Sequence, residues 1–299
     1  MSSNELLGGP AVPSSPHIVV GVDGSPDGKA ALAWAAAQAS RTKVGLRIVT
    51  AIGPNRQYVD NREAQRLMDQ VLSEAGSDAL AIDPDLVISH AQYLGSPSGV
   101  LIEESDGAHL LVVGSRGMGG FAGLLLGSVS RRCLHGAKCP IVVVRESDTP
   151  GSAGTIEHDR PRIVVGVDGS KSSNDALLWA GSQAQLTGAK LEAVMVWEWM
   201  QSYGWGLVVP DGLDPRADAG QALTEALEPV GRAFPDVVVD PVVIQGPATE
   251  LLVKASIGAD LLVVGSRGHS EVLGILIGSV SEHCATHAHC PVLVMHGTE

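Results

Sequence analysis

The chain has 299 residues, of which 44% are hydrophobic and 18% charged, so it can fill the cores of two ordinary domains and is not disordered throughout. A net charge of −13, with no basic cluster beyond Arg131–Arg132, argues against nucleic acids and anionic membranes as partners. The chain has no apolar segment as long as a membrane helix, no recognisable signal peptide, and only four cysteines. We therefore expect a cytoplasmic protein.

In chain order, short apolar runs predict strands at residues 17–22, 46–51, 85–91, 109–113 and 141–145. Helices are predicted from the cap Ser25-Pro26 onward and at residues 57–80, 96–105 and 128–136. Strict alternation of strands and helices favours parallel pairing through right-handed crossovers. The expected fold class is therefore α/β, doubly wound and Rossmann-like.

The second half of the sequence repeats the first. The segment IVVGVDGS at Ile18–Ser25 returns at Ile163–Ser170, and LLVVGSRG at Leu110–Gly117 returns at Leu261–Gly268. A repeat of this length indicates tandem domains rather than a solenoid. We expect a disordered tail over 1–16, a domain over 17–145, a linker over 146–161 and a second domain over 162–296.

Two loops in each repeat follow predicted strands at the edge where α/β sheets bind ligands. The first loop is Val22–Ser25, and the second contains Gly114 and Gly117, then nine residues, then Gly127-Ser128. Glycines let backbone N–H groups approach phosphate oxygens, and a helix beginning at Ser128 adds unpaired N–H donors. The alternative is that these glycines serve packing alone.

The pattern G-x2-G-x9-G-[ST], together with the VDGS loop and a late Cys-Pro before the last strand, resembles the universal stress protein family in its tandem two-domain, actinobacterial form. The resemblance covers nearly all of the chain outside the tail and the linker. It implies two tandem domains, each a five-stranded parallel sheet between helices. It also implies one ATP site per domain and dimerisation through the last strand.

The same resemblance assigns roles to individual residues. Asp23 and Asp168 would meet the ribose, and Val22 with Ala51 or Thr50, and Val167 with Val196 or Met195, would lie near the adenine. The phosphates would be wrapped by Gly114, Gly117, Gly127 and Ser128 in the first repeat and by Gly265, Gly268, Gly278 and Ser279 in the second. Arg116 and Arg267 would either balance phosphate charge or point to solvent. Mg²⁺ would accompany ATP, held mainly by phosphates and water.

Two other patterns remain open. Cys284, His287, His289 and Cys290 have the composition of a zinc site, although buried cysteines that pack as small apolar residues are the simpler interpretation. The second repeat carries an insertion over residues 197–213, rich in Trp and Tyr, which would form a loop folded over itself or else a lid or interface.

Three functions remain possible at this stage. The first is an ATP-binding regulator of stress response or growth, working as a homodimer or through pairing of the last strands within one chain. The second is a slow ATPase or a nucleotidyl-transfer enzyme, although no catalytic base, catalytic lysine or protein metal ligand is identified. The third is a non-catalytic interaction module.

Overall fold

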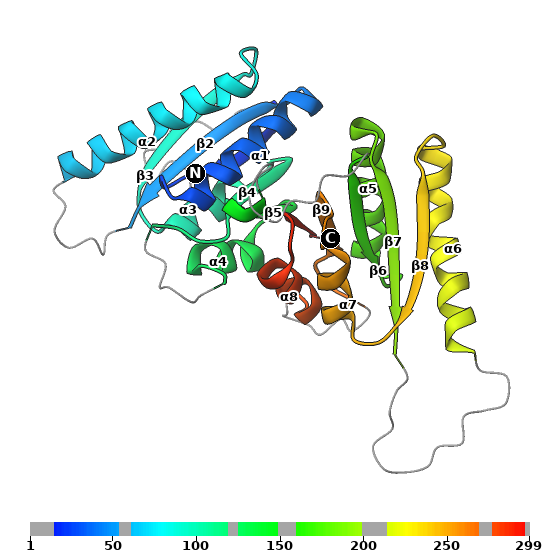
Figure 1. Cartoon of the computed structure of the whole chain (residues 1–299). Helices are drawn as coiled ribbons and strands as arrows, with labels where there is room; N and C mark the ends of the chain where they lie inside the picture. The colour runs from blue at the N-terminus through cyan, green and yellow to red at the C-terminus, as the bar shows by residue number, and fades with distance from the viewer. Residues whose placement is uncertain are drawn as a thin grey trace, which may run out of the picture. The chain divides into compact units, whose positions relative to one another are not determined.

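The computed structural model describes residues 15–53, 61–118, 125–148, 160–198, 214–268 and 277–296 (Figure 1). Its contacts divide the chain into two compact units: residues up to 155 with 291–296, and residues 156–290. Within the described ranges no helix is both long and apolar enough to cross a bilayer.

The first unit alternates strands and helices in the predicted order. Its elements are β1 (His17–Gly21), α1 (Pro26–Thr42), β2 (Gly45–Ile52), α2 (Asn61–Ile82), β3 (Ile88–Leu94), α3 (Pro97–Glu104), β4 (Leu110–Gly114), α4 (Ser128–Gly136), β5 (Ile141–Val144) and the 3₁₀ turn η2 (Glu146–Asp148). The five strands are parallel in the order β3-β2-β1-β4-β5. Helices α1 and α2 pack on one another, as do α3 and α4, and the two pairs cover opposite faces of the sheet. The predicted α/β fold class is confirmed.

The second unit repeats this arrangement. Its elements are β6 (Arg162–Val167), α5 (Lys171–Thr187), β7 (Lys190–Trp197), α6 (Pro215–Ala233), β8 (Val239–Gln245), α7 (Ala248–Ala255), β9 (Leu261–Gly265) and α8 (Ser279–His287). The strands are parallel in the order β9-β6-β7-β8. Most of the insertion, residues 199–213, lies outside the described residues.

The last strand, β10 (Val292–Met295), falls in the first unit and pairs antiparallel with β5. The register joins Val292 to Val143, Leu293 to Val142 and Val294 to Ile141. Both strands are buried and apolar, so the edge of β5 is covered by chain rather than left open. The last strands of the two repeats thus pair with one another within the chain.

One predicted element is displaced. The third strand begins at Ile88 rather than Asp85 and ends at Leu94 rather than Ala91. Asp83 explains the shift, because its side chain accepts the N–H of Asp85 at 2.9 Å and its carbonyl accepts the N–H of Leu86, so a turn occupies these residues. The predicted start of the preceding helix, at residues 57–60, lies outside the described residues.

Helix α1 shows how local sequence fixes an element. Ser25 caps it by accepting the N–H of Gly28 at 3.1 Å, and Pro26 stands in its first turn. The helix ends at Lys43, whose φ of 56° is left-handed. Along its inner face Ala31, Ala35, Ala36 and Ala39 are fully buried, and these small side chains let the helix lie close to the sheet.

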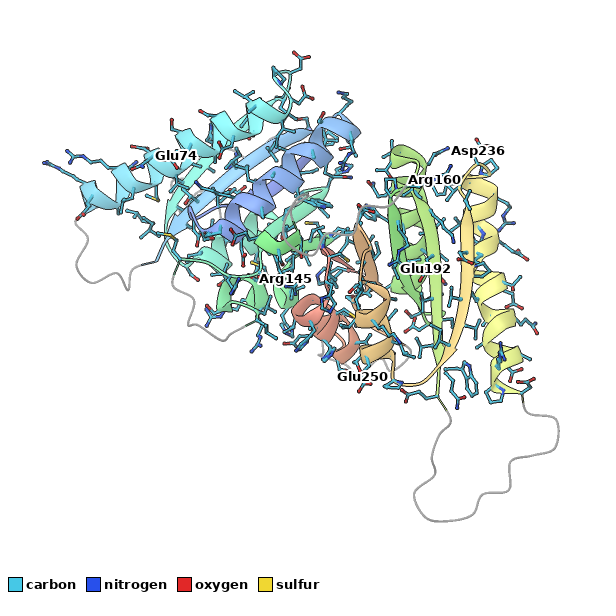
Figure 2. All side chains as sticks on the ribbon, in the orientation of Figure 1. Glu74, Arg145, Arg160, Glu192, Asp236 and Glu250 are labelled. Carbon is cyan, nitrogen blue, oxygen red and sulfur yellow. The ribbon has the colours of Figure 1, made fainter. Side chains whose placement is uncertain are left out.

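A buried polar group distinguishes the core of the first unit. Arg47 on β2 is 1% exposed, and its Nε lies 2.5 Å from Oε2 of Glu104. The hydroxyl of Tyr93 donates to the other carboxylate oxygen, Oε1. Glu192, labelled in Figure 2, occupies the matching position of β7. It pairs with Val164 as Arg47 pairs with Val19. There the charge is reversed, and Glu192 accepts from Arg162 at 2.9 Å. The repeats share a fold but not this core interaction.

Candidate functional site

The site lies where two loops meet at one edge of each sheet. In the first unit β1 and β4 are neighbouring parallel strands, with Gly21 opposite Val113, so the loops that follow them begin side by side. Strand order reverses at this point, since β2 lies on one side of β1 and β4 on the other. Open α/β sheets bind ligands at such a switch point. Strands β6 and β9 create the same edge in the second unit.

The carboxylate of Asp23 links the two loops. One of its oxygens accepts the N–H of Ser25 at 3.0 Å, and the other accepts the N–H of Met118 at 2.9 Å. The residue is exposed, so both oxygens keep a lone pair for a ligand. In the second unit Asp168 accepts the N–H of Ser170 at 2.9 Å in the same way. The matching neighbour for its other oxygen, residue 269, lies outside the described residues.

Glycines allow the close approaches that the site requires. A Cβ on Gly117 would lie 2.5 Å from Asp23 Oδ2, and one on Gly268 would lie 2.7 Å from Asp168 Oδ2. A Cβ on Gly114 would come within 2.7 Å of the backbone of Asp27, at the start of α1. Gly265 meets the start of α5 equally closely. These glycines let the loop after β4 or β9 press against the first loop.

The helix that follows each glycine loop begins without a side-chain cap. Gly127 is the N-cap of α4 and Gly278 that of α8, and within the described residues neither helix start has a side-chain cap hydrogen bond. Ser128 and Ser279 stand exposed at the first helical position. Helices α1 and α5, in contrast, are capped by serine hydroxyls. The starts of α4 and α8 therefore keep unpaired N–H donors and the positive end of the helix dipole.

A serine that sequence reasoning did not select holds each of these helix starts in place. Ser130 donates to the carbonyl oxygen of Gly114 at 2.6 Å, and Ser281 donates to that of Gly265 at 2.5 Å. In addition, the N–H of Gly127 donates to the carbonyl oxygen of Ser115 at 2.7 Å. The sequence contains a signal for both serines, because each is the last residue of a Gly-Ser-Val-Ser block that occurs in both repeats.

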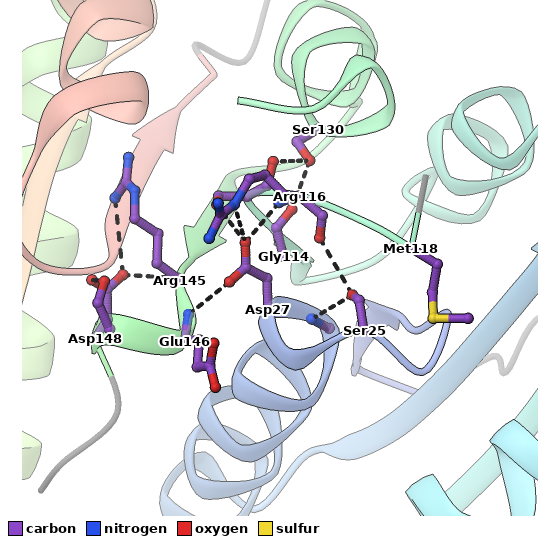
Figure 3. Close-up of polar contacts among 12 residues, drawn as sticks. Ser25, Asp27, Gly114, Arg116, Met118, Ser130, Arg145, Glu146 and Asp148 are labelled. Atoms are coloured by element: carbon purple, nitrogen blue, oxygen red, sulfur yellow. Dashed lines mark hydrogen bonds and ion pairs between the residues drawn. The ribbon is translucent and has the colours of Figure 1, made fainter. Parts of the chain in front are cut away.

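Asp27 is the second residue that sequence reasoning missed, and it belongs to the first unit alone (Figure 3). Its side chain is buried and accepts from the hydroxyl of Ser115, the N–H and Nε of Arg116, and the N–H of Glu146. Burial raises the pKa of Asp27, but these hydrogen bonds and the Arg116 charge outweigh burial and hold that pKa below its usual value. Comparing the two repeats does not point to Asp27, because Ser172 occupies the matching position of α5.

The two arginines of the glycine loops have different surroundings. Arg116 is half-exposed and pairs with Asp27 at 3.2 Å. Ser172 cannot form such a pair, and its hydroxyl donates instead to the carbonyl oxygen of Arg267 at 2.6 Å. Within the described ranges, the guanidinium of Arg267 has no acidic partner. The arginine of the second site is therefore the more available one.

The residues expected near adenine lie at the ends of adjacent strands. Val22 and Val167 are buried just beyond Gly21 and at the end of β6, and the N–H of Val22 donates to Val49 on β2 at 2.9 Å. Ala51 and Val196 lie near the ends of β2 and β7 and are half-buried. In both units an apolar floor thus lies across β1 or β6 from the glycine loop.

Within the described part of the chain, no three His, Cys, Asp or Glu side chains form a group that could hold a metal ion. All four cysteines are buried, and burial raises the pKa of Cys133, Cys139 and Cys284 to about 12. A protonated thiol is a poor metal ligand and a poor nucleophile. These cysteines pack as small apolar residues.

The fold and the site define a class: a duplicated, Rossmann-like α/β protein with paired loops at each switch point. A model of the universal stress protein family matches residues 15–145 and 160–296. The universal stress protein Rv2623 of Mycobacterium tuberculosis is 32% identical over 94% of this chain and 96% of its own length. One from Mycolicibacterium smegmatis is 32% identical over 93% and 96%. A solved universal stress protein from Archaeoglobus fulgidus matches the fold with a TM-score of 0.67 at 23% identity, covering 95% of this chain and 97% of its own. The chain belongs to the universal stress protein family.

Proposed function

We propose that each repeat binds one adenine nucleotide, ATP with Mg²⁺ in the first place, and that the occupancy of the two sites regulates the protein's activity in stress response or growth control. The observation that carries this proposal is the uncapped start of α4 and of α8, each beside a glycine loop at a switch point. N–H groups without a side-chain partner at such a place suit phosphate oxygens.

In this proposal the phosphates lie against Gly114, Gly117, Gly127 and Ser128 in the first site and against Gly265, Gly268, Gly278 and Ser279 in the second. Asp23 and Asp168 accept from the ribose hydroxyls. Their bonds to backbone N–H groups hold the carboxylates in position, because a carboxylate oxygen accepts more than one hydrogen bond. Adenine lies on the apolar floor of Val22 and Ala51, or of Val167 and Val196.

Bound Mg²⁺ would neutralise part of the phosphate charge, held by phosphate oxygens and water rather than by a protein cage. Regulation without rapid turnover fits the site. Asp27, a buried carboxylate beside the first loop, already accepts four hydrogen bonds, and a low pKa makes it a weak base.

The test begins with freshly purified protein, which is denatured so that released nucleotide can be identified by chromatography. We expect ATP close to two equivalents per chain. Gly117→Glu places a side chain and a negative charge against Asp23, so this variant should release close to one equivalent. Gly268→Glu should do the same through the second site, and the double variant should release none.

Gly231→Glu is the matched control, because it adds the same side chain at an exposed position of α6 where a Cβ meets nothing within 4 Å. It should release as much nucleotide as the unmodified chain. ADP in place of ATP would instead support slow hydrolysis. If no nucleotide is released and Mg-ATP gives no thermal shift, the proposal is wrong and an interaction module is the better account.

A further inference from the structure

The two loop sites have the same backbone plan but different charge. In the first, the second residue of the capping helix is Asp27, and in the second it is Ser172. We propose that, because of this difference, the second site binds a nucleoside triphosphate more tightly than the first. Asp27 lowers the affinity of the first site, and it does so more for ligands that carry more phosphates. The inference rests on the proposed function.

In the first unit an internal anion already occupies donors of the glycine loop. Asp27 Oδ2 accepts from the hydroxyl of Ser115 at 2.7 Å and from the N–H and Nε of Arg116 at 3.0 and 3.2 Å. Asp27 Oδ1 accepts the N–H of Glu146 at 2.9 Å. Figure 3 shows these contacts converging on one carboxylate between α1, the end of β4 and the segment after β5.

The consequence for an anionic ligand has two parts. First, the Nε of Arg116 donates to Asp27, so part of the charge of this guanidinium is already balanced within the protein before a phosphate arrives. Second, the carboxylate adds a negative charge to the loop, and since the Asp27 side chain is 4% exposed, water screens this charge less than it would at the surface. Its low pKa keeps it ionised at neutral pH.

Among the described residues of the second unit, neither effect is found. Ser172 is neutral, and its hydroxyl donates to the carbonyl oxygen of Arg267 at 2.6 Å, which fixes the loop without adding charge. Ser170, the helix cap, donates to the same carbonyl oxygen at 3.1 Å. The guanidinium of Arg267 has no acidic partner among the described residues, so it can pair with a phosphate directly.

The test measures each site alone. Gly268→Glu leaves the first site and Gly117→Glu leaves the second, and calorimetry then gives the Kd of each for Mg-ATP and for AMP. We expect Kd for ATP to be about tenfold lower at the second site, a ratio typical of one unfavourable charge contact near a protein surface. For AMP the difference should fall below about threefold, because fewer phosphate charges face Asp27.

Reciprocal exchange separates charge from structure. Asp27→Ser in the first-site chain should tighten ATP binding several-fold, whereas Ser172→Asp in the second-site chain should weaken it. Asp27→Ser also removes the hydrogen bond from the N–H of Glu146. Losing that bond cannot tighten ATP binding, so a gain in affinity would not arise from damage to the fold. Asp78→Ser on the exposed face of α2 removes the same charge away from the site and should leave both Kd values unchanged.

Equal Kd values for ATP at the two sites would overturn the inference and leave the proposed function standing. Weaker ATP binding after Asp27→Ser would overturn it as well, since it would mean that the carboxylate supports the site. Failure of both single-site chains and of the unmodified protein to bind ATP would overturn the proposed function itself.

Discussion

At the scale of single residues, Arg47 and Glu104 form an ion pair inside the first unit, with side chains 1% and 2% exposed. Burial lowers the pKa of Arg47, but the bonds and charge of Glu104 outweigh burial and raise it. A buried pair of this kind adds little net stability compared with apolar residues, yet losing one partner leaves a charge without compensation.

Glu104→Gln should therefore lower the free energy of unfolding by about 3–5 kcal/mol, measured by urea denaturation. The amide preserves the size of the side chain and one acceptor oxygen, so the loss reports the missing charge together with one lost acceptor. Glu103→Gln, one residue earlier and exposed, should change stability by less than about 0.5 kcal/mol. A loss under 1 kcal/mol in Glu104→Gln would show that Arg47 is compensated by other groups.

Tyr93 predicts a pH dependence. Burial, followed by the hydrogen bond and the negative charge of Glu104, raises the pKa of its phenol from 10.0 to about 12. Because the folded state holds this proton more tightly than the unfolded state, the stabilisation is fully present below pH 10 and is lost as the pH rises toward 12. The tyrosinate absorbance lost in Tyr93→Phe should titrate near pH 12 in the native protein, and a midpoint near 10 would contradict the burial of the phenol.

At the scale of elements, the caps of α1 and α5 also connect the two loops of each site. Ser25 accepts the N–H of Gly28 and donates to the carbonyl oxygen of Arg116 at 3.3 Å, and Ser170 has the matching pair of contacts in the second unit. The residue that begins the helix thus also places the glycine loop. Sequence reasoning assigned Ser25 the first role, but the second depends on β4 lying beside β1.

Ser25→Ala should lower the free energy of unfolding by about 1 kcal/mol, the usual cost of removing a serine cap. Chemical denaturation monitored by circular dichroism measures it. Ser73→Ala, on the exposed face of α2, removes the same hydroxyl away from a cap and should change stability by less than about 0.5 kcal/mol. Equal losses in the two variants would mean that the cap contributes nothing of its own.

Elements were predictable to different degrees. The valine-rich strands β1, β4 and β5 were placed within a residue or so, because runs of four or five apolar residues bounded by turn residues favour a strand buried on both faces. Strand β3 lies at the sheet edge, where half-exposed residues make the apolar pattern weak, and the prediction missed it by three residues.

At the scale of the whole molecule, β10 shows a limit of reasoning from repeats. The two copies of the sequence suggest two equal units, and the alternation of strands and helices gives each its own last strand. In the structure β10 pairs antiparallel with β5 and falls in the first unit, so the compact units do not coincide with the repeats. Strand sequences of this kind are apolar throughout and therefore fit more than one partner.

The sequence by itself determined the α/β fold class, the duplication, the order of elements and the two loops of each candidate site. These properties follow from local patterns: the spacing of apolar residues, the caps, and the positions of glycines. The structure then brought Val22–Ser25 against Gly114–Gly117, as the switch-point rule predicted.

Only the tertiary structure decided which side chains meet across those loops. Asp27 joins residues 88, 89 and 119 positions away, and no local pattern signals such a contact. In the sequence, Ser172 in place of Asp27 looks like an ordinary difference between the repeats. In the structure, Arg116 pairs with Asp27, whereas Arg267 has no acidic partner within the described ranges. Charge balance in a site depends on distances in space, and a sequence specifies these only after it has folded.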